Sequence, residues 1–183
     1  GNVCNGVTSA DSASSLFAYN AILELTGPEG IRQVPIQEFY TGPGKTVRRH
    51  EEVMTAIRIR RRDYEGYTGC YIKYGKRNAM EIATLGCACL VKLSWDKKVV
   101  EDMRIAYGVA APTPVRCPET EKAVSGKAVS KVLLLQTGKG VLNEVNPRTS
   151  WRASKEFRLQ LVEELAKRAM AQAIRNGGGE VDA

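Results

Sequence analysis

Three consecutive strand-like segments lie between positions 70 and 109, and they restrict the possible folds more than any other feature of this sequence. Cys70–Lys76 alternates between two sets of side chains, and Glu81–Ser94 and Val99–Val109 are two longer segments. An alternation with a period of two residues is typical of a β-strand. The short polar segment Ser94–Lys98 predicts a hairpin turn. We therefore expect a three-stranded antiparallel meander, one face of which must be covered by other elements.

The elements that cover this sheet follow it in the sequence. Three prolines between positions 112 and 118 lead the chain away from the sheet, and helices are predicted over Glu119–Val124, Ser130–Val145 and Ser154–Asn176. The second helix is the weakest prediction, because Gly138 and Gly140 each cost about 1 kcal/mol relative to Ala. The third is the clearest, since Ser154 can cap it and apolar residues recur at helical spacing: Phe157, Leu161, Leu165, Ala169 and Ala173.

The N-terminal part of the chain predicts a small sheet and one helix. Asp11–Asn20 has the pattern of a short helix. Ile22–Leu25 and Ile31–Ile36 are predicted to be the two strands of a hairpin, joined by the turn Gly27–Gly30. Val53–Ile59 alternates over its whole length and predicts a further strand.

A charged segment, Arg60–Tyr67, is the best internal boundary. It divides the chain into a domain over 1–66 and a domain over 67–176. The glycine-rich end, 177–183, predicts a disordered tail. The expected fold class is α+β: a small sheet with a helix, followed by a three-stranded antiparallel sheet packed on three helices.

The segment before the first helix, Gly1–Ser12, has the composition of a ligand-binding loop. Gly1 permits close approach of a ligand to the backbone, and Ser9, Asp11 or Ser12 can cap the helix. Exposed N–H groups at a helix start favour an anion such as a phosphate. A plain capped helix after a turn explains the same residues and is the commoner cause of this pattern. Because a glycine loop normally follows a strand, we expect the sequence to be a piece of a longer protein.

A second glycine-containing segment, Thr41–Thr46, resembles the end of a phosphate-binding loop. The nucleotide pattern GxxxxGK[ST] requires glycine at the position of Phe39, so the match fails. We interpret Thr41–Thr46 as a rigid turn.

The composition is that of an ordinary globular chain with an excess of positive charge. The formal net charge is +7, with one dense basic run at Arg58, Arg60, Arg61 and Arg62. No aromatic residues alternate with these charges, so a solvated strand end or a docking face for an acidic partner explains them more simply than nucleic acid does. A non-catalytic basic interaction module remains the alternative hypothesis for the function. No apolar segment is long enough for a membrane span.

The cysteines and the single histidine of this chain suggest neither a catalytic site nor a metal site. Cys87 and Cys89 are two positions apart in an apolar segment, so a strand would place both on one face. The five cysteines, an odd number without CxxC spacing, predict free thiols in a reducing cytoplasm. The single histidine, His50, lies in a charged segment, so a metal site and histidine-based catalysis are both unexpected.

Five separated blocks of the sequence carry a family resemblance. They are GNVCNGVTSADS at positions 1–12, FYTGPGKT at 39–46, YIKYGKRNAMEIATLGCA at 71–88, AYGVAAPTPVRC at 106–117 and SWRASKEFRLQLVEELAKRA at 150–169. Their order and spacing resemble the FAD-binding medium subunits of molybdenum hydroxylases, most of all those of the bacterial xanthine dehydrogenase type. The resemblance implies the second half of an FAD-binding domain, then a C-terminal domain with a three-stranded sheet on a three-helix bundle.

The resemblance also implies which residues of the N-terminal loop contact the cofactor. Gly1 and Asn2 match the end of the family's GGN loop, where the backbone approaches the flavin. Asn5 falls where the family places a polar side chain toward the cofactor, and Asp11 matches an acid that accepts hydrogen bonds from cofactor hydroxyls. A helix cap is an equally good explanation of Asp11 alone.

Two further cofactor contacts are implied on strands. Met54 matches an apolar residue beside the cofactor, and Lys73 matches a lysine near the isoalloxazine ring. A lysine there would stabilise negative charge on reduced flavin. Without the resemblance, Met54 would be core filling and Lys73 a solvated lysine. Arg77 and Glu81 match the family's Arg and Asp region, with an acid one methylene longer, and the role of Glu81 stays open.

The resemblance implies electron relay with partners rather than substrate chemistry in this chain. A molybdopterin large subunit would oxidise the substrate, and an iron–sulfur small subunit with two 2Fe-2S clusters would pass electrons to FAD here. NAD or another acceptor would receive them. The N-terminal half of the FAD subunit would complete the cofactor site, and no nucleic acid or membrane is expected as a partner.

Overall fold

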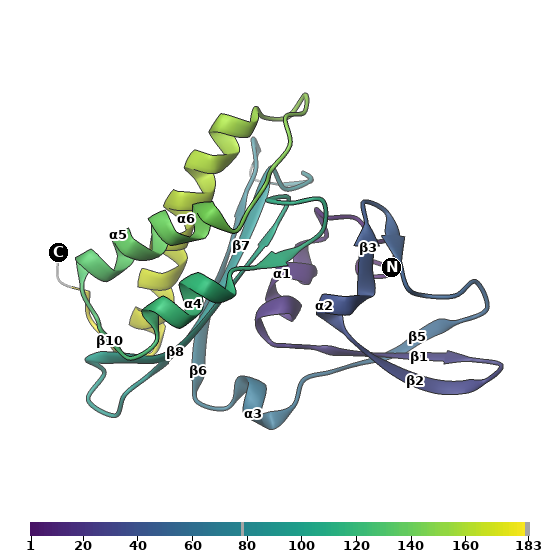
Figure 1. Ribbon diagram of the computed structural model, residues 1–183, viewed down its shortest axis with the longest axis horizontal. Coiled ribbons are helices and arrows are strands. Elements are labelled where there is room, and N and C mark those ends of the chain that lie inside the picture. Colours follow the sequence, from purple (N-terminus) through teal and green to yellow (C-terminus); the bar gives the residue numbers. More distant parts are fainter. Residues whose placement is uncertain (78, 182–183) are drawn as a thin grey trace.

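The computed structural model describes residues 1–77 and 79–181 (Figure 1). Its largest element is an antiparallel sheet of β6 (Tyr67–Tyr74), β7 (Leu85–Leu93) and β8 (Val99–Gly108), so the predicted meander is confirmed. Two short strands, β9 (Val115–Arg116) and β10 (Lys127–Ala128), each pair with β8 and extend the sheet to five strands.

The boundaries of two strands differ from the prediction. β6 begins at Tyr67 rather than at Cys70, and β7 begins at Leu85 rather than at Glu81. The residues before β7 belong instead to the loop from β6, where the Glu81 carboxylate accepts a hydrogen bond from the Arg77 backbone N–H. A side chain that folds back onto its own loop keeps this segment out of the sheet ladder.

Three helices cover one face of the sheet, as predicted (Figure 1). They are α4 (Pro118–Val124), α5 (Lys131–Gly140) and α6 (Lys155–Asn176). Ser154 caps α6 by accepting a hydrogen bond from the Phe157 N–H. The second helix was predicted to reach Val145, which is wrong: α5 ends at Gly140 and continues as the short 3₁₀ helix η1 (Val141–Asn143).

The two glycines in α5 allow close contact between helices. A Cβ atom on Gly138 would lie 3.0 Å from the Glu163 carbonyl oxygen of α6. A Cβ atom on Gly140 would lie 2.7 Å from Thr120 Oγ1 of α4. The low helix propensity of glycine is therefore offset by packing that a larger residue would prevent.

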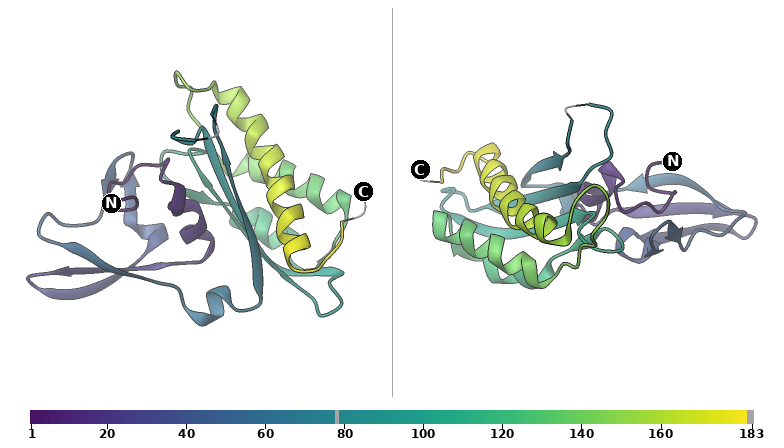
Figure 2. Two further views of the ribbon diagram at one scale, coloured as in Figure 1. Left: turned by 180° about the vertical axis from the view of Figure 1, so that it is seen from behind. Right: turned by 90° about the horizontal axis from the view of Figure 1, so that it is seen from above.

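The second face of the sheet is covered as well, which the sequence pattern did not predict. Cys87 and Cys89 point into the core with α4, α5 and α6, whereas Ala88 and Leu90 pack with α1 (Asp11–Ala18) on the other side. Figure 2 shows α1 and α6 on opposite sides of β6, β7 and β8. Burial on both faces explains why β7 has no polar alternation.

The N-terminal unit contains a second, smaller sheet in the order β2-β1-β5. Its strands are β1 (Ile22–Gly27), β2 (Gly30–Pro35) and β5 (Val53–Arg58), so the predicted hairpin and the further strand are confirmed. A short helix, α2 (Ile36–Phe39), leads into the two-stranded hairpin of β3 (Tyr40–Gly42) and β4 (Lys45–Thr46). The Thr41–Thr46 segment is thus the turn that we predicted and not a phosphate loop.

A buried polar network joins the N-terminal unit to the large sheet. Asn20, just after α1, donates to Asp63 Oδ1 at 2.9 Å, and Asp63 belongs to α3 (Arg61–Tyr64). The guanidinium of Arg104 on β8 lies 3.4 Å from the same carboxylate oxygen and donates to the Tyr67 hydroxyl at 3.0 Å. Because these groups are largely buried, their pairing fixes the two parts against each other.

The C-terminal end lies against the large unit as far as it is described. Val181 is partly buried against the main core, and Gly179 is also buried. Residues 182–183 of the predicted tail lie outside the described residues. Among the helices of the described residues, none is both long and apolar enough to cross a lipid bilayer.

Candidate functional site

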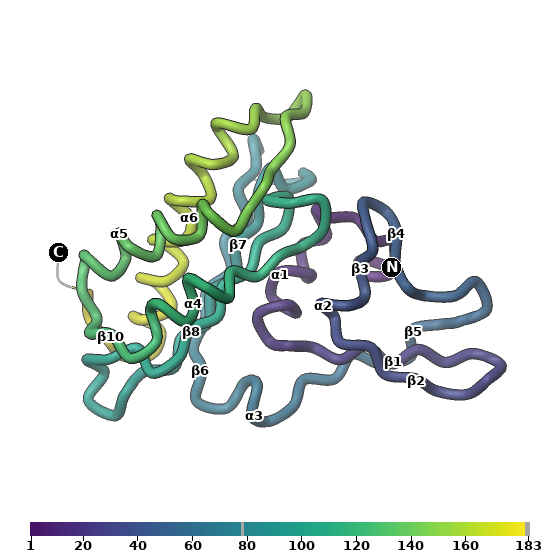
Figure 3. The backbone as a smooth tube through the Cα atoms, in the orientation of Figure 1, coloured from purple at the N-terminus to yellow at the C-terminus, as the bar shows by residue number. Residues whose placement is uncertain are grey.

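The N-terminal loop is built on the β3–β4 hairpin (Figure 3). Gly6 has a positive φ of 68°, and a Cβ atom there would lie 2.8 Å from the backbone of Gly44. The Gly44 N–H donates to the Gly6 carbonyl oxygen at 2.9 Å. Glycine is required at position 6 by both its conformation and this contact. Gly1 is different, since a Cβ atom there would meet nothing within 4 Å.

Asn2 caps the first helix from a distance in sequence. Its side-chain oxygen accepts hydrogen bonds from the Ser12 N–H at 3.3 Å and from the Ser12 hydroxyl at 2.6 Å. The residue at the cap position is Ala10, which has no side chain that can do this. The prediction that Ser9, Asp11 or Ser12 caps α1 is therefore wrong, because the acceptor comes from the loop.

Asp11 meets Lys73 across the two units. Lys73 Nζ donates to Asp11 Oδ2 at 2.7 Å, and the Tyr71 hydroxyl donates to Asp11 Oδ1 at 3.5 Å. Both members of the ion pair are partly exposed, with 33% of the Lys73 side chain and 46% of the Asp11 side chain accessible. Burial and the negative charge of Asp11 raise the pKa of Tyr71 to about 12, so this hydroxyl stays protonated at neutral pH.

An open hollow of about 390 Å³ lies beside the N-terminal loop. It is lined by Gly1, Asn2 and Ser12 on one side and by Met54 and its neighbours on β5 on the other. The structure therefore brings Gly1, Asn2 and Met54 together, and Asn2 links them through Ser12 to the helix that starts at Asp11.

The backbone of the loop offers donors to a ligand. Within the described residues, the N–H groups of Asn2, Val3 and Cys4 donate to no protein acceptor. Unpaired N–H groups beside a helix start suit the oxygens of a phosphate or pyrophosphate. Asn5 is not brought to the hollow: its Oδ1 accepts the Val7 N–H at 3.0 Å in a local turn.

Neither Asp11 nor Lys73 lines the hollow beside the N-terminal loop; Lys73 borders a second one, of about 320 Å³, formed by the loop between β6 and β7. Arg77, Met80 and Glu81 line it. The Glu81 carboxylate, whose role was left open, holds this loop through the Arg77 N–H, and the Arg77 side chain donates to the Met80 carbonyl oxygen at 3.0 Å. The loop that follows Lys73 is thus held in place by hydrogen bonds of its own side chains.

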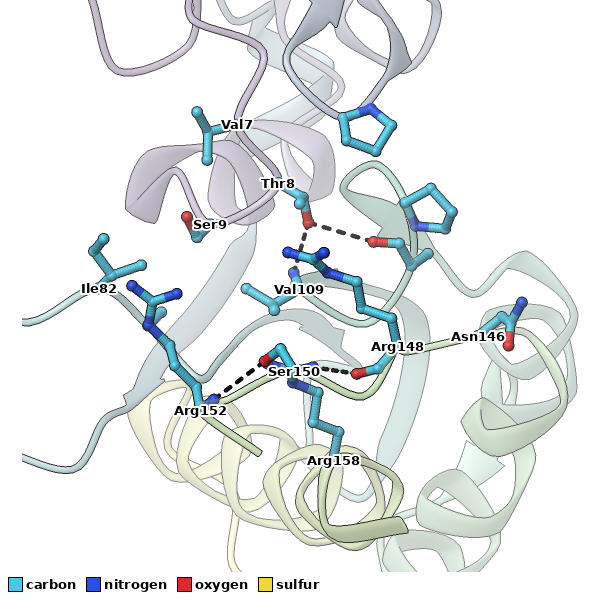
Figure 4. Close-up of a pocket in the computed structure, with 14 residues that line it drawn as sticks. Val7, Thr8, Ser9, Ile82, Val109, Asn146, Arg148, Ser150, Arg152 and Arg158 are labelled. Atoms are coloured by element: carbon cyan, nitrogen blue, oxygen red, sulfur yellow. Dashed lines mark hydrogen bonds between the residues drawn. The ribbon is translucent and has the colours of Figure 1, made fainter. Parts of the chain in front are cut away.

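A third cavity contains functional candidates that the sequence analysis did not single out. Arg148, Arg152 and Arg158 line it together with Thr8 and Ser9 (Figure 4). The three arginines lie before α6 or in its first turn, and Arg152 and Arg158 belong to a block quoted above only for its family resemblance. They share the cavity with Thr8, which lies more than a hundred positions earlier in the sequence, so no local pattern could reveal it.

The arginines of the basic run between the two units largely form ion pairs with carboxylates. Arg58 lies 2.8 Å from Glu24, and Arg61 lies 2.5 Å from Glu65. Local compensation of these charges weakens the hypothesis of a basic module for acidic or nucleic-acid partners.

The cysteines do not form a reactive or metal-binding site in the described residues. All five are free, and Cys87, Cys89 and Cys117 are buried. Burial raises the pKa of these three thiols well above its usual range, which makes them poor nucleophiles. No group of three or more His, Cys, Asp or Glu side chains suited to a metal is present among the described residues.

Two protein families match the chain. The family described as "CO dehydrogenase flavoprotein C-terminal domain" matches residues 70–173, and "FAD binding domain in molybdopterin dehydrogenase" matches residues 1–60.

Similar proteins and structures are known for nearly the whole chain. The xanthine dehydrogenase FAD-binding subunit of Escherichia coli O157:H7 is 42% identical over 99% of this chain and 61% of its own length. The glyceraldehyde dehydrogenase medium chain of Sulfolobus acidocaldarius is 31% identical over 94% of this chain and 61% of its own. A carbon monoxide dehydrogenase structure from Hydrogenophaga pseudoflava superposes with a TM-score of 0.88, covering 96% of this chain and 60% of that one at 28% identity. The chain thus spans about three-fifths of the length of these relatives.

Proposed function

The chain belongs to the CO dehydrogenase flavoprotein family, and on that premise we propose that it is the C-terminal part of the FAD-binding subunit of a xanthine dehydrogenase-like molybdenum hydroxylase. Bound FAD would supply electron exchange between iron–sulfur clusters on a small subunit and NAD or another acceptor. A molybdopterin-containing large subunit would carry out the oxidation of the substrate. The five free cysteines favour a reducing cytoplasm as its location.

We assign the residues around the Asp11–Lys73 pair to the cofactor. Gly1 leaves open space beside the backbone, and the N–H groups of Asn2, Val3 and Cys4 are unpaired among the described residues, which fits a pyrophosphate. Met54 supplies an apolar wall to the same hollow. Asp11 has carboxylate oxygens at the edge of the loop that can accept hydrogen bonds from hydroxyl groups of the cofactor. Asn5 would need to release its local turn to join this set, so we give it a supporting role in shaping the loop.

Lys73 has the central electrostatic role in this proposal. Its ammonium group is held beside Asp11 at the junction of the two units, and one-third of the Lys73 side chain is exposed. A positive charge in a partly dry site stabilises negative charge on a neighbouring group more strongly than it would in water. Lys73 would therefore favour the reduced, anionic form of a flavin bound next to it.

The hollow is open, and the relatives are longer than this chain. We propose that the part of their length that this chain does not match supplies the rest of the cofactor cradle. The observation that carries the proposal is the ion pair of Asp11 with Lys73, because Asp11 is adjacent to Ser12, which bonds to Asn2 at the edge of the hollow.

The flavin content of the assembled enzyme tests the assignment. Purified enzyme carrying Asp11→Ala is expected to retain less FAD, measured by absorbance of the released cofactor, than the parent enzyme. Arg60→Ala, an exposed change in the segment before α3, is the matched control and should retain FAD fully. Full FAD content in Asp11→Ala, or an assembled parent enzyme without flavin, would contradict the proposal.

A further inference from the structure

The arginine cavity has a volume of about 320 Å³ and three separate walls. One wall is the end of the N-terminal loop at Thr8 and Ser9, and another is the loop after β8, from Val109 to Pro112. The third is the segment that leads into α6 and carries Arg148 and Arg152. Figure 4 shows both guanidinium groups pointing from this third wall toward Thr8 and Ser9. The volume lies in the range of small-molecule sites.

Arg158 forms the floor of the cavity and is only 2% exposed. Its Nε donates to the Thr84 carbonyl oxygen at 3.3 Å, one Nη donates to Ser150 Oγ at 2.8 Å, and the other donates to the Arg148 carbonyl oxygen. All three acceptors are neutral. A buried guanidinium without a counter-ion is costly, since buried charges are normally paired.

The positive charge of the cavity is uncompensated within the described part of the chain. No carboxylate pairs with Arg148, Arg152 or Arg158 there, and no lining residue is acidic. Burial, together with repulsion from Arg148 and Arg152, lowers the pKa of Arg158. Arg152 stacks on the Trp151 ring at 4.2 Å, which holds its guanidinium plane in place without neutralising it.

The wall opposite the arginines is held firmly in position. The Val109 N–H donates to both the carbonyl oxygen and the hydroxyl oxygen of Thr8, each at 3.1 Å. Val109 has a positive φ of 69°, which is strained for a β-branched residue. The contact with Thr8 maintains this strained backbone beside the cavity.

We propose that this cavity binds a phosphate-type oxyanion, with Arg148 and Arg152 as its charged ligands and Arg158 as the buried charge beneath them. Two guanidinium groups can together donate hydrogen bonds to several phosphate oxygens in fork-like geometry. Ser9 and Ser150 provide hydroxyl donors around them, whereas the Thr8 hydroxyl donates to the Ala111 carbonyl oxygen at 3.4 Å. The anion is either free phosphate or pyrophosphate, or the pyrophosphate of a dinucleotide. The site does not depend on FAD, because none of the residues assigned to the flavin lines it.

Calorimetric titration of the 183-residue chain with sodium pyrophosphate at constant ionic strength tests this site. Saturable binding is expected, and Arg148→Gln and Arg152→Gln should each weaken it by about ten-fold, equivalent to about 1.4 kcal/mol, because each removes a charged hydrogen-bond donor. Arg60→Gln removes the same charge from an exposed position outside the cavity and should leave the affinity unchanged. These variants leave Arg158 in place because its removal could unfold the protein.

Competition experiments identify the source of the anion. Displacement of bound pyrophosphate by NAD⁺ would assign the site to a dinucleotide. Binding of inorganic pyrophosphate that NAD⁺ does not displace would assign it to a free anion. Both results support the site. Absence of saturable binding, or equal loss in the Arg60→Gln control, would overturn the proposal. Displacement of bound pyrophosphate by FAD would also overturn the proposal, because the cavity would then not be separate from the flavin site. Flavin content, measured independently, reports on the proposed function and not on this cavity.

Discussion

Lys73 Nζ lies 2.7 Å from Asp11 Oδ2 and thereby ties the end of β6 to the first turn of α1, although 62 positions separate them in the sequence. The Tyr71 hydroxyl approaches the other oxygen of the same carboxylate. The large sheet and the N-terminal loop therefore meet at one charged junction.

Replacing Lys73 by Met should make a bound flavin harder to reduce. Loss of one nearby positive charge in a partly exposed site is expected to lower the two-electron midpoint potential by about 30 mV, equivalent to about 1.4 kcal/mol. Spectroelectrochemical titration of the assembled enzyme measures this shift. Lys73→Arg should restore most of the potential, and Lys92→Met, an exposed change on β7, should not alter it. Equal potentials and flavin contents in the parent and Lys73→Met would exclude the proposed role.

Replacing Asn2 by Ala should destabilise the protein by about 1 kcal/mol, the usual cost of losing a helix cap. The Asn2 side chain is the acceptor for the Ser12 N–H and hydroxyl. Urea unfolding followed by circular dichroism gives the free energy of unfolding. Asn2→Asp keeps an acceptor and should remain close to the parent. The capping role is refuted if Asn2→Ala and Asn2→Asp unfold at the same urea concentration as the parent.

Glu52 should contribute to the acid sensitivity of the N-terminal unit. Hydrogen bonds from the Arg32 guanidinium at 2.6 and 2.9 Å and from the Arg49 N–H at 2.7 Å lower the pKa of Glu52 to about 2. A lowered folded-state pKa means that this stabilisation is complete above the ordinary pKa of 4.5 and is lost as the pH falls toward 2.

The comparison of Glu52→Gln with the parent chain measures this effect. The free energy of unfolding of the parent should fall more steeply between pH 4.5 and pH 2 than that of the variant. Glu29→Gln, at an exposed salt bridge, is the control and should follow the parent curve. Parallel curves for the parent and Glu52→Gln would count against the Arg32–Glu52 pair.

The glycines of α5 should respond to substitution in the direction opposite to helix propensity. Alanine normally stabilises a helix by about 1 kcal/mol relative to glycine. Gly138→Ala and Gly140→Ala should instead destabilise the protein, because the new Cβ atoms would lie 3.0 Å and 2.7 Å from atoms of α6 and α4. Gln136→Ala, at an exposed position of the same helix, should be neutral within about 0.5 kcal/mol. Thermal unfolding of the three variants measures these changes in stability. If Gly138→Ala or Gly140→Ala stabilised the protein, α5 could move away from α6 and α4 without a loss of stability.

Thiol labelling should divide the cysteines into two classes. Cys4 and Cys70 are partly exposed, whereas Cys87, Cys89 and Cys117 are buried. Burial also raises the pKa of Cys70, so Cys4 should react fastest with a disulfide reagent at pH 7.5. The three buried thiols should react only after unfolding in urea. Cys4→Ser should remove the fastest phase, and rapid reaction of all five thiols in the native chain would contradict the burial described here.

Much of the secondary structure follows from local patterns in the sequence. The spacing of five apolar residues predicted α6: Phe157, Leu161, Leu165, Ala169 and Ala173. Four of them are buried in the structure, whereas Phe157 in the first turn is 40% exposed. Alternation in Val53–Ile59 predicted β5 for the same reason, since side-chain direction repeats every two residues in a strand. The resemblance of five blocks suggested the flavin-binding set, but only the structure brings Asp11 to Lys73.

Local patterns failed where the determining contact comes from elsewhere in the chain. The cap of α1 is Asn2 rather than a residue at the start of the helix, and the glycines of α5 are explained by Glu163 and Thr120 on other helices. β7 was not predicted to be covered on both faces, because α1 precedes it by more than sixty positions.

The sequence by itself thus determined the elements, because helix and strand periods, caps and turns depend on residues a few positions apart. Tertiary structure decided how these elements meet: the Asp11–Lys73 pair, the hollow beside Met54 and the cavity of Arg148, Arg152 and Arg158. Each of these depends on packing between distant segments, where side-chain volume and charge are matched only after the chain has folded.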